Sequence, residues 1–412
     1  MFKFAAHLLM PFCLFSVFAH ANNLNQKHKM PNIRYEHVLG DERIAQTVLI
    51  QDPLIKSYSL PPLLQALKNI KVSSSNSGKN RIQVVYVGDG YTQQEMQQYR
   101  DDVKAQIATF LEQEPFKTYQ KYFSFHVIEV PSEESGVSES SEQLKNTAFE
   151  MHYKCGGIDR LLCINLSKLS QALQKAPKAD IVFALANSEK YGGAGYLSPA
   201  VATLAARNKS SSELAFHEIG HSFGKLIDEY ETTDASANCN SYQNVSSIDR
   251  HEMLAKKLKW FRWLDLSHIS TFKGGCYSQN FYRPTENSKM RSLKRPFEEI
   301  NVEQFVKRIH EKVKLTENIN TKNLASGHML IDLNLMQPVG HNLTLNWFIN
   351  GQEVSQLRNA SEINTAKLNL TNTSVALKLV VQDQTTMLRD ENFRNNQMTQ
   401  IYKWDLELSG LE

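Results

Sequence analysis

One stretch limits this chain more than any other: residues 216–230 read F-H-E-I-G-H-S-F-G-K-L-I-D-E-Y. Two histidines four residues apart, His217 and His221, lie one turn apart on the same face of a helix. Such a pair can bind one metal ion, and the carboxylate of Glu218 can take a proton from a metal-bound water. The stretch therefore predicts a helix with a metal-binding face.

The flanks predict the same helix and a turn after it. Ser210 and Glu213 have the spacing of a capping box. Apolar residues recur through the stretch at Leu214, Phe216, Phe223 and Leu226. Gly224 permits a sharp turn that brings a third ligand back to the histidines. Asp228 is the first choice for this ligand, and Glu229 is the alternative.

The spacing differs by one residue from a known zinc pattern. Zinc metzincins place a third histidine ten residues after the first. That position is Ile227 here, which cannot bind metal, and Asp228 follows one residue later. The turn must therefore be wider. The alternative is an ordinary amphipathic helix with a chance H-E-x-x-H, but the glycine and the acids after it favour a metal site.

The first residues predict a secretory signal peptide at 1–21. Lys3 gives a positive start, Phe4 to Phe18 form an apolar core, and Ala19-His20-Ala21 is an A-x-A cleavage site. A membrane anchor is the alternative, but the apolar run is too short and Pro11 interrupts it. We expect a secreted or periplasmic protein without membrane insertion after signal cleavage.

Composition is ordinary for a globular protein, with 41% hydrophobic and 22% charged residues in a chain of 412. This length permits more than one domain. The formal net charge of +3 is too small to favour nucleic acid as a partner.

Four cysteines remain after signal cleavage removes Cys13. An even number in an exported chain predicts two disulfides. Proximity in the sequence favours Cys155 with Cys163, and Cys239 with Cys276. Free buried thiols are the alternative.

Three regions follow the signal peptide. Residues 22–78 read as an N-terminal arm or small subdomain with a linker, including a strand at Val48–Ile50 and a helix at Leu60–Ile70. Residues 79–316 read as an α/β catalytic domain. Its predicted strands are Arg81–Val87, Phe123–Val130, Ile158–Ile164 and Asp180–Ala186, and its predicted helices begin at Thr92, with Glu95 at capping-box distance, and at Val302.

Residues 320–412 have a different character. Asn-rich turns separate short strands, and the alternation predicts an immunoglobulin-like β-sandwich. Its predicted strands are Gly327–Leu335, Leu343–Ile349, Ala376–Val381 and Ile401–Leu408. We expect Trp347 and Trp404 to lie in its core.

Two glycine-containing loops have both a structural and a functional interpretation. Gly88-Asp89-Gly90 is either a tight turn or a site where Asp89 binds a cation or orients the active site. Gly192, Gly193 and Gly195 lie before the metal helix. They either form a plain hairpin or let a substrate backbone approach an edge strand.

Six separated motifs now support a family. G-D-G-Y-T, E-S-G-V, T-A-F, Y-K-C-G-G-I-D-R-L-L-C, Y-G-G-A-G and the H-E-I-G-H stretch occur in one order. Together they resemble the IgA-peptidase family of bacterial zinc metallopeptidases over about residues 81–315. The resemblance implies a metzincin-like (zincin) catalytic domain of α/β (α+β) class. It also implies a zinc ion held by His217, His221 and Asp228, with Glu218 as general base.

The resemblance extends to a methionine turn, F-Y-R-P-T-E-N-S-K-M-R, with Met290 beneath the metal. The family usually has a cysteine before that methionine, where this chain has Ser288. Tyr282 and Tyr230 are both candidates to donate a hydrogen bond to the oxyanion, and we take Tyr282 as the catalytic candidate.

The sequence thus predicts a secreted zinc metallopeptidase acting on protein or peptide substrates. Two alternatives remain at this point. One is an exported, adhesin-like binding protein with a non-catalytic zinc site. The other is a zinc hydrolase that cleaves a cell-wall amide.

Overall fold

The computed structural model describes residues 34–39 and 78–409, apart from 175, 198–199 and 232–237. The chain divides into two units, 1–31 and 32–412, and every described residue belongs to the second. The predicted signal peptide, the strand at Val48–Ile50 and the helix at Leu60–Ile70 lie outside the described residues.

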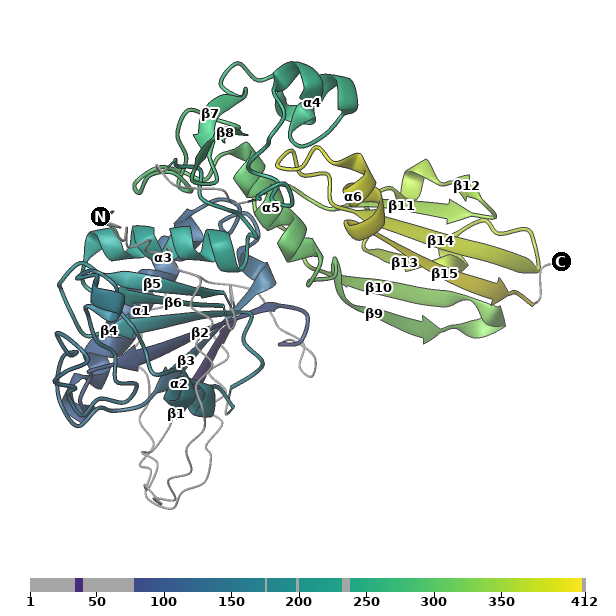
Figure 1. The fold of residues 1–412 in the computed structure, drawn as a ribbon. Helices are drawn as coiled ribbons and strands as arrows, with labels where there is room; N and C mark the ends of the chain where they lie inside the picture. Colours follow the sequence, from purple (N-terminus) through teal and green to yellow (C-terminus); the bar gives the residue numbers. More distant parts are fainter. Residues whose placement is uncertain (1–33, 40–77, 175, 198–199, 232–237, 410–412) are drawn as a thin grey trace. The chain divides into compact units, whose positions relative to one another are not determined.

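A six-stranded mixed sheet has the strand order β1-β3-β2-β4-β6-β5 (Figure 1). Its strands are β1 (Arg34–Leu39), β2 (Ile82–Asp89), β3 (Phe123–Glu129), β4 (Ile181–Ala186), β5 (Gly193–Leu197) and β6 (Ala200–Ala205). The strands β3, β2, β4 and β6 run parallel, and β1 and β5 pair antiparallel at the two edges. The expected α/β class is confirmed.

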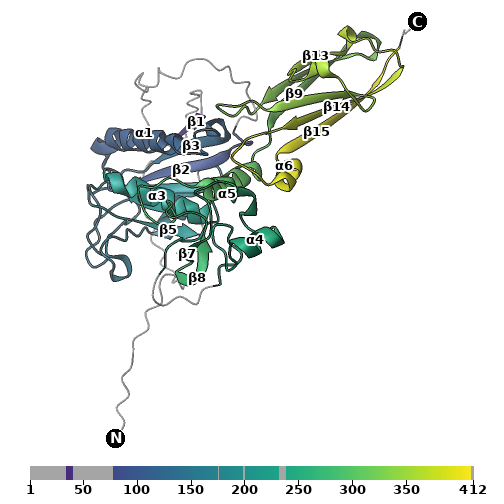
Figure 2. The same ribbon diagram turned by 90° about the horizontal axis from the view of Figure 1, so that it is seen from above.

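Both faces of this sheet are buried, which explains the continuous apolar runs in its central strands. Successive residues of a strand point to opposite faces. Val84 and Tyr86 of β2 thus join one hydrophobic cluster, and Val85 and Val87 join another. Helices α1 (Met96–Glu112), α3 (Lys209–Ser222) and α5 (Glu299–His310), which Figure 2 labels, contribute to the first cluster. Helix α2 (Leu166–Leu173) contributes to the second.

Two local predictions are wrong. Residues 158–164 form no strand, because the Cys155–Cys163 disulfide closes a turn there in which Lys154, Gly156 and Gly157 have positive φ. An isolated bridge joins His152 to Cys163. The second error is the capping box expected before the metal helix, described below. The capping box of Thr92 and Glu95 before α1 is confirmed.

Between α3 and α5 the chain forms α4 (Arg250–Lys256) and a hairpin of β7 (Phe272–Gly275) and β8 (Ser278–Arg283). The Cys239–Cys276 disulfide joins the segment after α3 to this hairpin, so both predicted disulfides are confirmed. No helix in the described ranges combines the length and the apolar character that crossing a membrane requires.

The last part of the chain contains two antiparallel sheets, β13-β10-β9 and β12-β11-β14-β15. The strands are β9 (Thr316–Asn323), β10 (Met329–Leu335), β11 (Thr344–Ile349), β12 (Gln352–Glu353), β13 (Glu362–Asn364), β14 (Ser374–Gln382) and β15 (Thr399–Glu407). Residues of both sheets share one hydrophobic cluster around the fully buried Trp347, with Trp404 packed against it.

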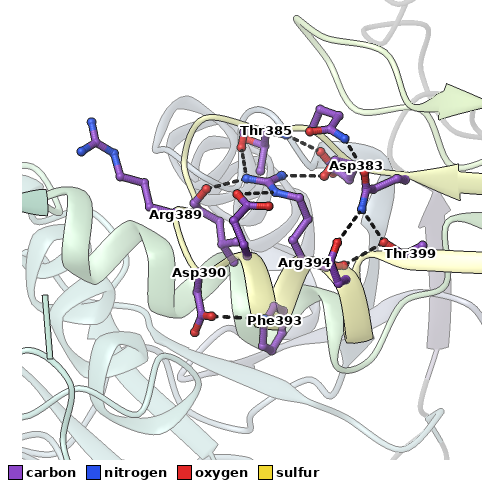
Figure 3. A network of polar contacts seen from close by, with 12 residues as sticks. Asp383, Thr385, Arg389, Asp390, Phe393, Arg394 and Thr399 are labelled. Atoms are coloured by element: carbon purple, nitrogen blue, oxygen red, sulfur yellow. Dashed lines mark hydrogen bonds and ion pairs between the residues drawn. The ribbon is translucent and has the colours of Figure 1, made fainter. Parts of the chain in front are cut away.

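The connection from β14 to β15 contains α6 (Glu391–Gln397), a helix that the sequence analysis did not predict. Arg394 of α6 donates hydrogen bonds to the backbone carbonyls of Asp383, Thr385 and Leu388, which fixes the preceding loop (Figure 3). Leu388 and Met398 belong to the same hydrophobic cluster as α1 and α3. These two residues of the β14–β15 connection thus pack into the cluster of the six-stranded sheet, whereas the two C-terminal sheets have a separate cluster of their own.

Candidate metal centre

The two histidines of H-E-x-x-H lie on the last turns of α3, which packs against β5 and β6. Asn208, and not Ser210, caps this helix by accepting a hydrogen bond from the Ser210 backbone N–H. Glu213 instead accepts hydrogen bonds from the Lys289 ammonium and the Lys294 backbone. The expected capping box is wrong because Glu213 has this stronger, charged partner elsewhere.

Backbone carbonyls orient both imidazole rings. His217 Nδ1 lies 2.9 Å from the carbonyl oxygen of Lys289, and His221 Nδ1 lies 3.0 Å from that of Leu226. A carbonyl only accepts, so each Nδ1 must donate its proton. In the neutral rings the lone pair then resides on Nε2. The two Nε2 atoms face each other at 3.1 Å.

The turn after α3 is made by a residue that the sequence did not single out. Lys225 has the left-handed backbone conformation, with φ of 54°, and Gly224 does not. Gly224 is needed for space, since a Cβ there would lie 2.8 Å from the carbonyl oxygen of Gly220. The chain then returns to the helix, where the Leu226 N–H donates to that same oxygen. The turn is wide enough to reach the eleventh residue after His217.

That residue, Asp228, completes a group of three metal-ligating side chains with the histidines. Its Oδ1 lies 3.0 Å from His217 Nε2 and 3.4 Å from His221 Nε2. Oδ1 is buried and has no hydrogen-bond donor. Glu229, the alternative ligand, is fully buried elsewhere and accepts hydrogen bonds from Asn244 and Ser288.

These three atoms fit a small tetrahedral cation, such as the zinc ion that the family resemblance implies. Their separations are 3.1, 3.0 and 3.4 Å. Ligands at 2.0–2.1 Å from a tetrahedral zinc ion lie about 3.3 Å apart. In the neutral rings, both Nε2 atoms and Asp228 Oδ1 point lone pairs at one another, with no proton between them. A cation bound among these three atoms would satisfy all three lone pairs.

The charges respond to this arrangement. Burial would raise the pKa of Asp228, but the two imidazoles outweigh burial and hold this pKa well below its usual range. Burial would lower the pKa of His221, but Asp228 outweighs burial and raises it to about 9. A proton on the imidazole and a bound cation thus compete for the same place.

Glu218 lies directly against the edge strand β5. A Cβ at Gly195 would lie 1.9 Å from Glu218 Oε2 and 3.0 Å from Glu218 Cβ. Any side chain at this position would displace the carboxylate. Gly192 and Gly193 likewise make room for the chain's own atoms, with Tyr153 and the Thr203 carbonyl filling the space beside them.

The buried turn that contains Ser288 and Met290 packs against the helix that carries the two histidines. A Cβ at Gly220 of α3 would lie 2.3 Å from the sulfur of Met290, whose side chain is fully buried. The Met290 carbonyl accepts a hydrogen bond from the Glu229 N–H. Ser288 donates to the Glu229 carboxylate and accepts from the Met290 N–H. This turn therefore connects the metal helix with the loop that carries Asp228.

Three tyrosines lie in this region, and one of them was missed from the sequence. Tyr282 lies on β8, where its backbone pairs with Ser246. Burial, and then the charge of Asp228, raise the pKa of Tyr230. The hydroxyl of Tyr277 donates to Asp228 Oδ2 at 2.5 Å. Its position beside Cys276, in the predicted disulfide, was the available signal.

Asp89 has a structural part in the fold. It is fully buried, and its carboxylate accepts hydrogen bonds from the Thr147 hydroxyl and the backbone N–H groups of Phe149 and Met151. Burial raises its pKa, and these hydrogen bonds oppose the effect. Asp89 thus fixes the 147–151 segment at the end of β2, and both of its carboxylate oxygens accept hydrogen bonds from that segment.

Comparison with known proteins agrees with the motifs. Residues 70–268 match the family model described as IgA Peptidase M64, a region that contains α3 and Asp228 but ends before Met290. No curated protein matches the chain. The match confirms the resemblance drawn from the six motifs. Residues 70–268 are thus similar to the IgA peptidase M64 family, and this similarity supports a peptidase.

Proposed function

We propose that the chain is an exported, zinc-dependent peptidase in which His217, His221 and Asp228 hold the metal and Glu218 is the general base. The observation that carries this proposal is the convergence of two Nε2 atoms and one donor-free carboxylate oxygen within 3.4 Å of one another. Glu218 follows His217 on the same helix, and its charge helps to raise the pKa of His221.

A bound zinc ion would lower the pKa of a water molecule and polarise the substrate carbonyl. Glu218 would accept a proton from the attacking water molecule. It later passes the proton to the leaving amine. The carbonyl contacts at His217 and His221 keep both Nε2 atoms aimed at one point throughout.

A tyrosine hydroxyl is proposed to stabilise the oxyanion. Tyr282 was the residue chosen from the sequence. Tyr230 is the second candidate, because it lies close enough to Asp228 for that charge to help raise its pKa. Replacing each by phenylalanine would decide between them, since loss of an oxyanion donor lowers kcat by about 10²–10³.

We further propose that an extended substrate pairs with β5. This strand is the last in the six-stranded order, and it lies beside Glu218. An edge strand offers unpaired N–H and C=O groups for such pairing. A peptide added there would place its main chain next to the general base.

Two further parts of the proposal concern the rest of the chain. Disulfides persist in oxidising compartments, and two are present, which supports export by the predicted signal peptide. For residues 320–412 we propose an immunoglobulin-like sandwich. Its sheets β13-β10-β9 and β12-β11-β14-β15, with a buried tryptophan on β11, are the features that support this assignment.

The test is cleavage of a diverse peptide mixture by the zinc-loaded mature protein. We expect new termini with the wild type, and a loss of about 10²–10⁴ in rate for Glu218→Gln at equal zinc content. Glu252→Gln, on the surface of α4 beside Lys256, is the matched control and should cut normally. A Glu218→Gln variant that cuts at the wild-type rate would refute the base assignment.

A further inference from the structure

The segment that joins β7 to β8 has an uncommon backbone. Cys276 and Tyr277 are consecutive non-glycine residues with φ of 51° and 61°. Residues with side chains seldom adopt this left-handed region, and such conformations persist where the surroundings impose them. The segment is therefore held in place by its contacts.

Three contacts hold this segment, and two of them reach the loop that carries Asp228. The Cys276 N–H donates to the Asp228 carbonyl, and the Tyr277 N–H donates to the Tyr230 carbonyl, each at 2.9 Å. The third contact is covalent, the disulfide of Cys276 with Cys239. Both sulfur-bearing residues are buried, at 0% and 2% exposure.

The result is a fixed hydroxyl on one oxygen of Asp228. Tyr277 donates to Oδ2 at 2.5 Å, and Oδ1 faces the two histidine nitrogens. The Tyr277 ring also packs edge-on against Tyr230, with centroids 5.4 Å apart. The two oxygens of this carboxylate therefore have different surroundings. Oδ2 accepts a hydrogen bond from the tyrosine, and Oδ1 faces the histidines, where a cation could bind.

We propose that Tyr277 is a positioning residue that holds Asp228 in the orientation of a one-oxygen metal ligand, and that the Cys239–Cys276 disulfide in turn holds Tyr277. This inference rests on the proposed function, in which Asp228 binds zinc. A carboxylate free to turn could offer either oxygen. Outer partners of metal ligands remove that freedom, and losing one typically lowers metal affinity by about 10–100-fold.

The first experiment measures zinc affinity by competition with a chromophoric chelator, and the absorption spectrum of the cobalt-substituted protein. Tyr277→Phe keeps the ring and removes the hydroxyl. We expect about 10–100-fold weaker zinc binding and a changed cobalt spectrum. Tyr242→Phe removes a hydroxyl from the cluster around the same disulfide and should behave as wild type.

The outcomes separate the inference from the proposed function. If the wild type binds no stoichiometric zinc, the proposed function fails. If the wild type binds zinc and Tyr277→Phe binds it equally well with the same cobalt spectrum, the positioning role is overturned.

The second experiment tests the disulfide. Replacing Cys239 and Cys276 by alanine should weaken zinc binding, and adding Tyr277→Phe to that variant should weaken it little further, because both changes act on one contact. Replacing Cys155 and Cys163 is the matched control, with unchanged zinc affinity expected. Fully multiplicative losses from Tyr277→Phe and removal of the Cys239–Cys276 disulfide would overturn the link between them.

Discussion

Two places in this molecule contain the same set of side chains and differ in what they can do. Asp228 lies against His217, His221 and the hydroxyl of Tyr277. Elsewhere in the chain, one aspartate likewise contacts two histidines and a tyrosine hydroxyl, and these residues are Asp383, His310, His341 and Tyr119. In both places the contacts hold the pKa of the aspartate well below its usual range against the effect of burial.

The difference lies in convergence. His310 contacts Oδ2 of Asp383 at 3.3 Å, whereas His341 contacts Oδ1 at 2.8 Å. Tyr119 and the Thr385 N–H donate to the two oxygens as well, so both are occupied. Within the described part of the chain, the imidazole nitrogens and the carboxylate oxygen at Asp228 all lie within 4.8 Å of one another, and those at Asp383 do not meet this limit. The same side chains therefore form different arrangements, and only at Asp228, of these two places, do two histidines on one helix turn meet an oxygen without a donor.

The largest effect comes from exchanging each aspartate for asparagine. Asp228→Asn should lower zinc affinity by more than about 100-fold, the most that loss of an outer partner usually causes. Asp383→Asn should leave zinc affinity unchanged and lower the free energy of unfolding by about 3 kcal/mol, because the buried partners lose the carboxylate that they contact. Chelator competition and urea denaturation of metal-free protein measure the two quantities. Weakened zinc binding in Asp383→Asn would break the distinction.

Acid should reveal the Asp383 cluster as a smaller effect. The pKa of Asp383 is lowered in the folded state, so its contribution to stability is present above the ordinary carboxyl pKa of about 3.9 and is lost as pH falls below it. The stability difference between metal-free wild type and Asp383→Asn should therefore shrink between pH 6 and pH 3, by on the order of 1 kcal/mol. Asp159→Asn, at an exposed turn, is the control. A stability difference that grows as the pH falls would show that the pKa of Asp383 is not lowered in the folded state.

The smallest expected effect is at His341, whose side chain is 25% exposed, in contrast to the fully buried His310. His341→Gln removes one hydrogen bond to a charged group that water can partly replace. We expect a loss of about 1 kcal/mol in unfolding free energy and no change in zinc affinity. Thermal or urea unfolding measures this loss. A loss as large as that of Asp383→Asn would show that His341 alone carries the cluster.

Sequence predicted what depends on near neighbours in the chain. The metal helix, the buried strands β2 and β4 and the capping box at Thr92 follow from local periodicity and capping. The predicted strand at 158–164 fails because a disulfide and left-handed residues override the β-rich pattern. The short helix α6 was missed because its residues are polar and lack a helical apolar period.

The candidate site shows the same division. H-E-x-x-H brings His217 and His221 together by helix geometry alone, but which acid lies beside them depends on the turn at the left-handed Lys225, which has no sequence signature. Tyr277 was missed because it reaches Asp228 through a distant pairing of cysteines, from a segment almost fifty residues later. Such contacts arise from tertiary structure and leave only indirect traces in the sequence.

Ser288 stands where the family resemblance implies a cysteine, and its contacts bear on how relatives of this chain are recognised. Its hydroxyl joins the Glu229 carboxylate to the Met290 backbone inside a fully buried turn. A hydroxyl and a thiol occupy similar volumes, so either can fill this position, one connecting the segments by hydrogen bonds and the other by a covalent bond. Searches for relatives that require the cysteine would pass over chains of this kind. A search that accepts either serine or cysteine at this position would recover them.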